Sequence, residues 1–505
     1  MLKFGFNRDL YLERQSASIM ERVNAQQKLY LEFGGKLMGD LHAMRCLPGF
    51  DANAKIKLLH KLREQCEVVI CIYAGDLENN KVRSDYGTAY DREVLRMIDD
   101  FRAWDLKVNS LVITRFAGEV QAQQFGESLE KRGIKVYYHQ KTKGYPVDVE
   151  TIVSPEGYGQ NAYIETTRPL VILTAPGPNS GKLATCLSQL YHESLRGVQA
   201  GYAKFETFPV WNLPLKHPVN IAYESATADL RDVNMIDPFH LEAYGISTVN
   251  YNRDVEAFPV LRRILKKING DDFDVKSPTD LSVNQVGFCI TDDQVVQEAS
   301  RQEIIRRFFI AAEDYKLGRV KRETLERCQL LMEELNLKAE DRPVVVAARD
   351  YQAEVEARGT VPPALARSVM ALELNSGKIV TGRSSEQMTA TASCLLNALK
   401  AIAGLHDELH LLAPSAINPI YKLKAEVLKQ HDKALNSQEV LMALAISAAT
   451  NPLADLALKQ IKQLKAAQAH TTTILKHAEK DTYRSLGIDL SAEPVYASDN
   501  LYYDH

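Results

Sequence analysis

The chain has 505 residues, of which 45% are hydrophobic and 25% are charged, and its formal net charge is −4. This length exceeds what one hydrophobic core supports, so we expect several domains in a globular protein. The nearly balanced charge gives no general attraction to nucleic acid or to an anionic membrane, and it argues against both as partners.

Cysteine usage and the apolar segments predict a cytoplasmic protein. The seven cysteines are scattered and show no CxxC spacing, which argues against a disulfide framework and against a thiolate zinc site. Residues 1–10 lack the continuous apolar run of a signal peptide. No window reaches the run of about 18 uncharged apolar residues that a membrane-spanning helix needs.

The first part of the chain alternates between strand-like and helix-like patterns. Strand-like runs occupy residues 28–33, 67–74, 108–114, 135–138 and 169–174, and helical spacing occupies residues 15–23, 54–65, 90–104, 120–132 and 182–195. This alternation predicts an α/β fold in which a parallel sheet is covered by helices on both faces. In such three-layer folds, ligands bind beyond the carboxyl ends of the strands.

The rest of the chain is less regular. Aromatic residues and prolines between 204 and 226 predict an ordered but irregular connection. Residues 292–337 have helical spacing, and prolines and a glycine within 339–363 predict a linker. Residues 369–374 and 379–381 resemble a hairpin. We therefore expect an N-terminal α/β region over residues 1–275, a helical subdomain over 276–345 and a smaller C-terminal α/β or α+β domain over 346–505.

The strongest chemical signal is a glycine- and lysine-containing turn between the strand that ends at Thr174 and the following helix. We predict that it binds phosphate through Gly177, Asn179, Ser180, Gly181, Lys182 and Thr185. The amides of a first helical turn are unpaired and carry partial positive charge. Glycines let that backbone approach an anion, and the lysine adds a full charge.

This P-loop-like turn departs from the Walker A pattern. Only three residues separate Gly177 from Gly181, and Leu183 follows Lys182 where Ser or Thr is required. Thr185 or Ser180 would have to supply the magnesium-binding hydroxyl. The cofactor is therefore left open, with ATP or another nucleotide with Mg²⁺ as one option. The structural alternative is an ordinary glycine-rich turn.

A second turn, Gly34-Gly35-Lys36, also follows a strand. It is similar to the glycine turn of amino-acid kinases, but a GGK sequence after a strand is common by chance. The interpretation as a tight turn is favoured, and the three residues are retained as a possible second phosphate loop.

Polar side chains are concentrated between residues 217 and 242. Asp229, Asp232, Asp237 and His240 are the predicted catalytic residues, because carboxylates assist phosphate chemistry directly or through Mg²⁺. The identity of any metal is left open, since no paired-histidine motif is present. The structural alternative is a solvated helix face followed by a turn at Pro238.

Long runs of the chain resemble an uncharacterised bacterial protein family, known mainly as a conserved domain of unknown function. The resemblance rests on LYLEFGGKL, LPGFDANAKIKLL, TAPGPNSGKLATCLSQLYHE and DVNMIDPFHLEAYG, and it spans essentially the whole chain. It implies a cytosolic, multidomain, oligomeric α/β protein. Some relatives carry an ATP-dependent peptidase label, but the sequence shows neither a peptidase nucleophile nor a zinc signature. The family supplies no catalytic residues.

Two functions remain open. The first is an enzyme that binds a nucleotide or a phosphorylated small molecule at the glycine-lysine turn, with its reaction class unassigned. The second is a non-catalytic ligand-binding or scaffold protein that forms a homo-oligomer.

Overall fold

The computed structural model describes residues 3–82, 87–270, 274–359, 361–430 and 432–499. It divides into two compact units. The sheet unit contains Phe4–Glu224 and Asp232–Gln297, and the C-terminal unit contains Glu298–His505 with the short segments Ser225–Arg231 and Met1–Lys3.

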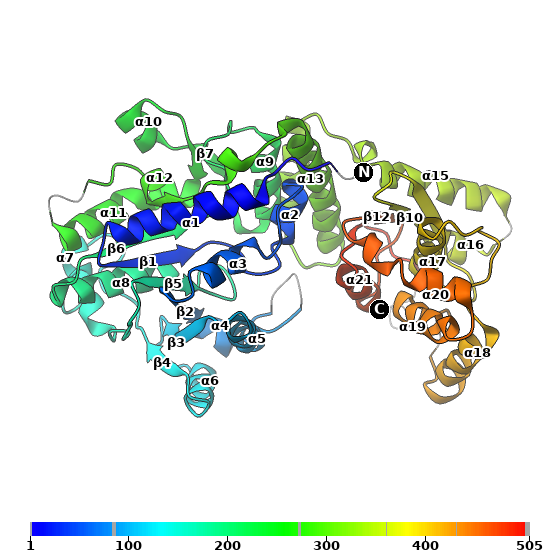
Figure 1. Ribbon diagram of the computed structural model, residues 1–505, viewed down its shortest axis with the longest axis horizontal. Coiled ribbons are helices and arrows are strands. Elements are labelled where there is room, and N and C mark those ends of the chain that lie inside the picture. Colours follow the sequence, from blue (N-terminus) through cyan, green and yellow to red (C-terminus); the bar gives the residue numbers. More distant parts are fainter. Residues whose placement is uncertain (1–2, 83–86, 271–273, 360, 431, 500–505) are drawn as a thin grey trace. The chain divides into compact units, whose positions relative to one another are not determined.

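The sheet unit is built on a seven-stranded parallel sheet (Figure 1). Its strand order is β4-β3-β2-β5-β1-β6-β9. The strands are β1 (Lys28–Phe33), β2 (Cys66–Tyr73), β3 (Lys107–Thr114), β4 (Lys135–Tyr138), β5 (Leu170–Thr174), β6 (Ala200–Phe205) and β9 (Ser282–Val283). All six strand pairings are parallel. The predicted parallel α/β fold is thus confirmed.

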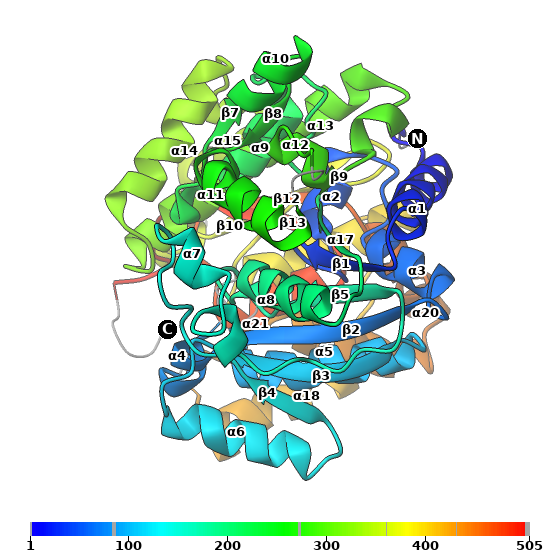
Figure 2. The same ribbon diagram turned by 90° about the vertical axis from the view of Figure 1, so that its left-hand side faces the viewer.

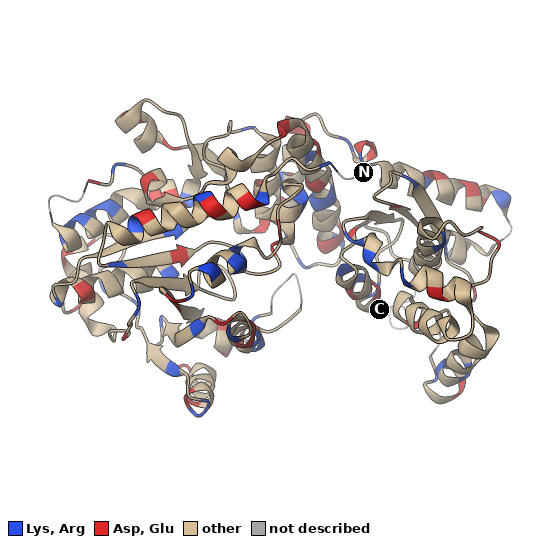
Figure 3. Cartoon of the chain, viewed as in Figure 1, with Lys and Arg blue, Asp and Glu red and all other residues tan. Residues whose placement is uncertain are grey.

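Helices cover both faces of this sheet (Figures 1 and 2). Figure 2 shows α8 (Lys182–Leu195) and α11 (Asn252–Asn269) on one face, and α1 (Arg8–Asn24) and α3 (Ala54–Lys61) on the other. The phenol of Tyr30 in β1 donates to Glu193 of α8 at 2.7 Å, which fixes the side of β1 that faces α8. Figure 3 shows both signs of charge along α1, as expected for a helix with one solvated face.

Smaller elements complete the sheet unit. They are α2 (Leu41–Cys46), α4 (Ala74–Glu78), α5 (Tyr90–Ala103), α6 (Val120–Glu130), α7 (Val149–Ile152), α9 (Pro218–Ala226), α10 (Pro238–Tyr244), α12 (Pro278–Leu281) and an antiparallel pair, β7 (Asn234–Ile236) and β8 (Val249–Tyr251). The expectation of an irregular segment over residues 204–226 is only partly correct, because its ends belong to β6 and α9. None of the helices formed by described residues combines the length and apolar character needed to cross a bilayer.

The connections from β1 and β5 leave their strands in opposite directions. From β1 the chain passes β5 to reach β2, whereas from β5 it passes β1 to reach β6. The helices of these two crossovers, α3 and α8, lie on opposite faces of the sheet. Adjacent strands with this property form a topological switch point, and the crevice beyond their carboxyl ends is the usual ligand site of an open α/β sheet.

The C-terminal unit combines helices with a smaller mixed sheet. Its strand order is β11-β10-β12-β13, in which only the β12–β13 pairing is parallel. The strands are β10 (Val369–Glu373), β11 (Ile379–Arg383), β12 (Gln468–Thr471) and β13 (Asp489–Ala492), and the preceding helices are α13 (Asp293–Lys316), which begins in the sheet unit, and α14 (Arg322–Glu334). The predicted hairpin, helical stretch and smaller C-terminal α/β domain are confirmed.

The linker predicted over residues 339–363 is wrong, because α15 (Pro343–Arg358) occupies most of it. Pro343 is at the start of the helix, where a missing N–H costs nothing. Gly359 follows its last turn with φ of 59°, the left-handed geometry that commonly ends a helix. The proline and the glycine therefore mark the two ends of a helix.

Candidate functional site

The helix α8 begins without a side-chain cap. Gly181 occupies its N-cap position with φ of 83° and has no side chain to accept from the first amides. Within the described part of the chain, the N–H groups of Lys182, Leu183 and Ala184 have no hydrogen-bond acceptor. Three unpaired amides therefore remain at the positive end of the α8 dipole.

Close packing explains the two glycines of this turn. A Cβ atom on Gly177 would lie 2.2 Å from the Tyr90 hydroxyl, and one on Gly181 would lie 2.8 Å from Oγ1 of Thr114. Neither position has room for a side chain. Tyr90 from α5 and Thr114 from the end of β3 thus press the turn against the carboxyl edge of the sheet.

Hydrogen bonds hold the rest of the turn. Thr114 donates to the Ser180 carbonyl at 2.8 Å, and Ser180 donates to the Gly177 carbonyl at 2.6 Å. The guanidinium of Arg115 donates to the Asn179 carbonyl. Thr185 donates to the Gly181 carbonyl at 3.0 Å. The hydroxyl protons of Ser180 and Thr185 are thus used within the turn, which holds its backbone in one conformation.

Lys182 points toward the end of β1. Its Nζ lies 3.8 Å from Oε1 of Glu32, and the two side chains are only 13% and 12% exposed. The phenol of Tyr202 in β6 donates to Oε2 of Glu32 at 2.9 Å. Lys182 therefore lies beside the unpaired amides in a largely buried, polar environment.

Further charged groups continue from Glu32 across the sheet. Lys204 is the register partner of Glu32 on β6. Its Nζ lies 2.8 Å from Glu206 and also pairs with Asp254 in the first turn of α11. We call Glu32, Lys182, Lys204, Glu206 and Asp254 the edge cluster. Alternating charges from two strands and two helix starts thus meet on the α8 face of the sheet.

Burial and charge shift the protonation of this cluster. Burial by itself lowers the pKa of Lys204, but the carboxylates of Asp254 and Glu206 outweigh it and raise that pKa. Burial raises the pKa of Glu206 to about 7, and the neighbouring Asp254 adds to the effect while Lys204 opposes it. A carboxyl group with a pKa near neutrality can both accept and donate a proton.

The sequence alone did not single out Glu32, Tyr202 or Asp254. Glu32 carried a weak signal, since it is the one acidic residue in the strand KLYLEF. Asp254 gave none, because an acidic residue in the first turn of a helix usually only complements the helix dipole.

The second glycine turn lies beside the first. The pairing of β1 with β5 places Glu32 opposite Leu173, so Gly34 follows β1 where Ala175 follows β5. The amide of Gly34 donates to the Phe205 carbonyl at 2.9 Å, and Gly35 has φ of 69°. Gly34, Gly35 and Lys36 therefore form a bend at the same edge of the sheet as the turn before α8.

Asp237 and His240 are engaged in structural contacts. Asp237 is fully buried and caps α10 by accepting from the amides of Phe239 and His240 at 3.0 and 3.1 Å. It also accepts from the Thr279 hydroxyl at 2.7 Å. Nδ1 of His240 lies 2.9 Å from the Ser277 hydroxyl. These contacts fasten α10 to α12 and leave little capacity for a ligand.

The other two predicted catalytic residues belong to different units. Asp232 lies in the sheet unit and is paired with Arg253 at 2.6 Å, while burial raises its pKa. Asp229 belongs to the C-terminal unit, and burial raises its pKa as well. Asp232, Asp237 and His240 thus lie in the sheet unit, and Asp229 lies in the C-terminal unit. Among the described residues, no group of three or more His, Cys, Asp or Glu side chains is arranged to hold a metal ion.

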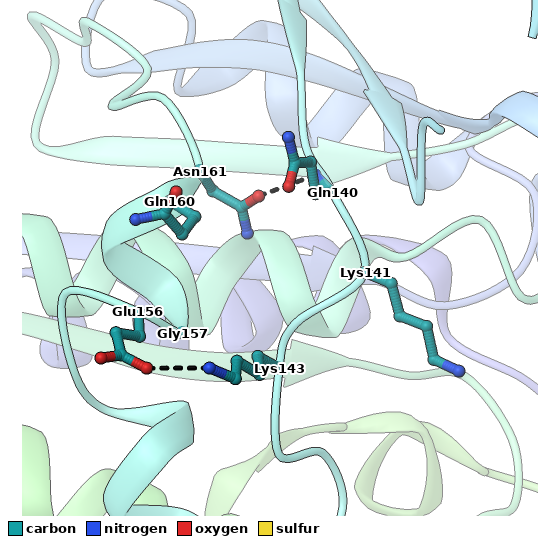
Figure 4. Close-up of a pocket in the computed structure, with 7 residues that line it drawn as sticks. All are labelled: Gln140, Lys141, Lys143, Glu156, Gly157, Gln160 and Asn161. Carbon is teal, nitrogen blue, oxygen red and sulfur yellow. Dashed lines mark hydrogen bonds and ion pairs between the residues drawn. The ribbon is translucent and has the colours of Figure 1, made fainter. Parts of the chain in front are cut away.

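A shallow pocket lies beyond the carboxyl end of β4 (Figure 4). Residues of this pocket pair with one another. Lys143 forms an ion pair with Glu156 at 2.9 Å, and the Asn161 side chain accepts a hydrogen bond from the backbone amide of Gln140 at 2.8 Å. The Asn161 carbonyl lies 2.7 Å from Nε2 of His192. His192 follows Lys182 by about 15 Å along α8, so this pocket is remote from the unpaired amides.

Comparison with known proteins assigns the family. Residues 4–336 match "Domain of unknown function DUF1846, N-terminal", and residues 340–502 match "Domain of unknown function DUF1846, C-terminal". A UPF0371 protein of Clostridium botulinum (strain Langeland) is 60% identical over 504 residues, and one of Clostridium tetani (strain Massachusetts) is 57% identical over 507 residues. Both alignments cover 100% of this chain and 100% of the relative. The chain therefore belongs to the DUF1846 family.

Proposed function

We propose that the glycine-lysine turn at the switch point of the sheet binds the phosphate group of a nucleotide or a phosphorylated small molecule. The phosphate would contact the turn formed by Gly177, Asn179, Ser180, Gly181, Lys182 and Thr185. The observation that carries the proposal is the uncapped start of α8 with the largely buried Lys182 at its first position.

Three features favour an anion over an ordinary turn. The turn is held rigid by Thr114 and Arg115, so its backbone is preorganised before a ligand arrives. Lys182 has limited exposure, which reduces the screening of its charge by water. The turn lies at the switch point of the sheet, the position at which such folds bind ligands.

The edge cluster supports an enzyme in preference to a passive binder. Glu206, with its pKa near 7, is suited to transfer a proton at neutral pH. The charge of Lys204 lowers that pKa and the charge of Asp254 raises it. The proposed protein is thus an enzyme acting on a phosphorylated ligand, with acid–base chemistry supplied by Glu206.

Calorimetric titration with pyrophosphate, AMP and ATP, each with and without Mg²⁺, tests phosphate binding. The Lys182→Met variant should lose about tenfold to a hundredfold in affinity, because a hydrogen bond to a charged group contributes about 1.5–3 kcal/mol. Lys131→Met is the matched control, since Lys131 is exposed just past α6. The proposal fails if no probe binds the wild-type protein, or if Lys182→Met binds as tightly as Lys131→Met.

A further inference from the structure

A second pocket lies beyond the carboxyl end of β2, the strand next to β5. It is lined by α4, α5 and α6, with Asp76, Asn80, Tyr90, Asp91, Gln121 and Gln124 among its residues. The pocket belongs to the sheet unit, and the proposed phosphate site does not account for it.

Tyr90 separates this pocket from the phosphate turn. Its hydroxyl is the atom that a Cβ on Gly177 would meet, and the same side chain lines the pocket. A ligand whose phosphate is bound at the start of α8 would have to pass Tyr90 to reach the pocket.

One residue that lines the pocket has an unsatisfied carboxylate oxygen. Oδ1 of Asp91 is buried and has no hydrogen-bond partner among the described residues. The other acids have partners: Asp76 pairs with Lys81 at 3.2 Å, and Glu78 accepts from the Gln121 amide at 2.8 Å. A buried carboxylate oxygen without a partner is costly, so a donor from a ligand is expected to complete its hydrogen bonding.

The remaining lining favours hydroxyl groups over a cationic group. Asn80, Gln121 and Gln124 each carry both amide donors and an acceptor. A hydroxyl group can donate to Asp91 and accept from these amides, whereas an ammonium group can only donate. In dinucleotide-binding folds an acidic residue likewise accepts from ribose hydroxyls near a glycine-rich phosphate turn.

We infer that this pocket binds the hydroxylated ring of a sugar phosphate, with Asp91 accepting from a ring hydroxyl. The inference rests on the proposed function, because it takes the phosphate to be bound at the start of α8. It specifies the ligand as a phosphorylated sugar or a nucleoside phosphate.

Titration calorimetry with ribose 5-phosphate and methyl phosphate tests the inference, since the two ligands share a phosphate monoester and differ in the sugar. The wild-type protein should bind ribose 5-phosphate at least about tenfold more tightly, as one hydrogen bond to a charged group provides. The Asp91→Ala variant should lose that preference and retain its affinity for methyl phosphate. Asp99→Ala, an exposed position on the same helix α5, should retain the preference.

The possible failures are distinguishable. If the wild-type protein binds both ligands equally, or if Asp91→Ala keeps the full preference for ribose 5-phosphate, the inference is overturned while the phosphate site stands. If neither ligand binds, the proposed function and the inference fail together. The comparison of two ligands on the wild-type protein does not depend on how well the variant folds.

Discussion

The helices α8 and α10 both begin in segments that the sequence marked as functional, yet they satisfy their first amides differently. Asp237 caps α10 with one carboxylate oxygen and fastens it to Thr279 with the other. The start of α8 has Gly181 in the corresponding position and no cap. The amides of α10 are used by the protein itself, while those of α8 remain available to an anion.

This difference separates structural polar groups from groups available for binding. A carboxylate near a helix start is a cap wherever it can reach the N2 and N3 amides. A glycine in the same position, held by close packing and followed by an inward-facing lysine, leaves the amides open. The type of residue at the N-cap therefore indicates whether the first amides of a helix are available to a ligand better than the local density of charged residues does.

The largest effect is expected for Asp237→Ala. The substitution removes the cap of α10 and the charged hydrogen-bond partner of the buried Thr279 hydroxyl, which keeps only its contact with Thr248. The free energy of unfolding should therefore fall by about 3 kcal/mol. Urea denaturation measures this change. Asp237→Asn, which can still cap the helix, should lose about 1 kcal/mol. Equal losses for the two variants would show that the contacts of Asp237 are not what stabilises α10.

A pH-dependent effect is expected from Glu206, which follows β6 and pairs with Lys204. The pKa of Glu206 is raised from 4.5 to about 7 in the folded protein, mainly by burial. Its contribution to stability is therefore complete below pH 4.5 and is lost as the pH rises through about 7. The loss amounts to at most about 3 kcal/mol. The neighbouring charge of Lys204 favours the ionised form of Glu206 and makes this loss of stability smaller.

The Glu206→Gln variant isolates this contribution. We expect its free energy of unfolding to decline less steeply than that of the wild-type protein between pH 4.5 and 7. Urea denaturation at several pH values measures both slopes. Parallel pH profiles would contradict the raised pKa of Glu206.

The smallest effect on stability is expected between two alanine substitutions, one at each end of α8. Gly181 and Gly197 have φ of 83° and 73°, so alanine at either position costs about 1–2 kcal/mol of backbone strain. Only Gly181 lies against Thr114, whereas the space around Gly197 is open. Gly181→Ala should therefore be less stable than Gly197→Ala by about 1 kcal/mol. Equal melting temperatures of the two variants would mean that Thr114 can move away from the added methyl group without loss of stability.

The sequence predicted the strands β1 to β5 and the longer helices α1, α3, α5, α6 and α8, but not the short helices α2, α4 and α7. Their apolar runs and helical spacing are local patterns, and local patterns determine the type of an element. The strand β6 was missed, because Ala200, Gly201 and Ala203 give it little strand propensity. Its pairing with β1 depends on residues distant in the chain.

What the sequence determined by itself is the family, the α/β class and the glycine-lysine turn, because each is written in contiguous residues. Only the tertiary structure decided which charged groups meet. Glu32, Lys182, Lys204 and Asp254 come from four separate elements and lie together because parallel pairing brings the carboxyl ends of distant strands to one edge. The cap at Asp237 is local, since its amides belong to Phe239 and His240, whereas the contact of Asp237 with Thr279 depends on packing between distant residues.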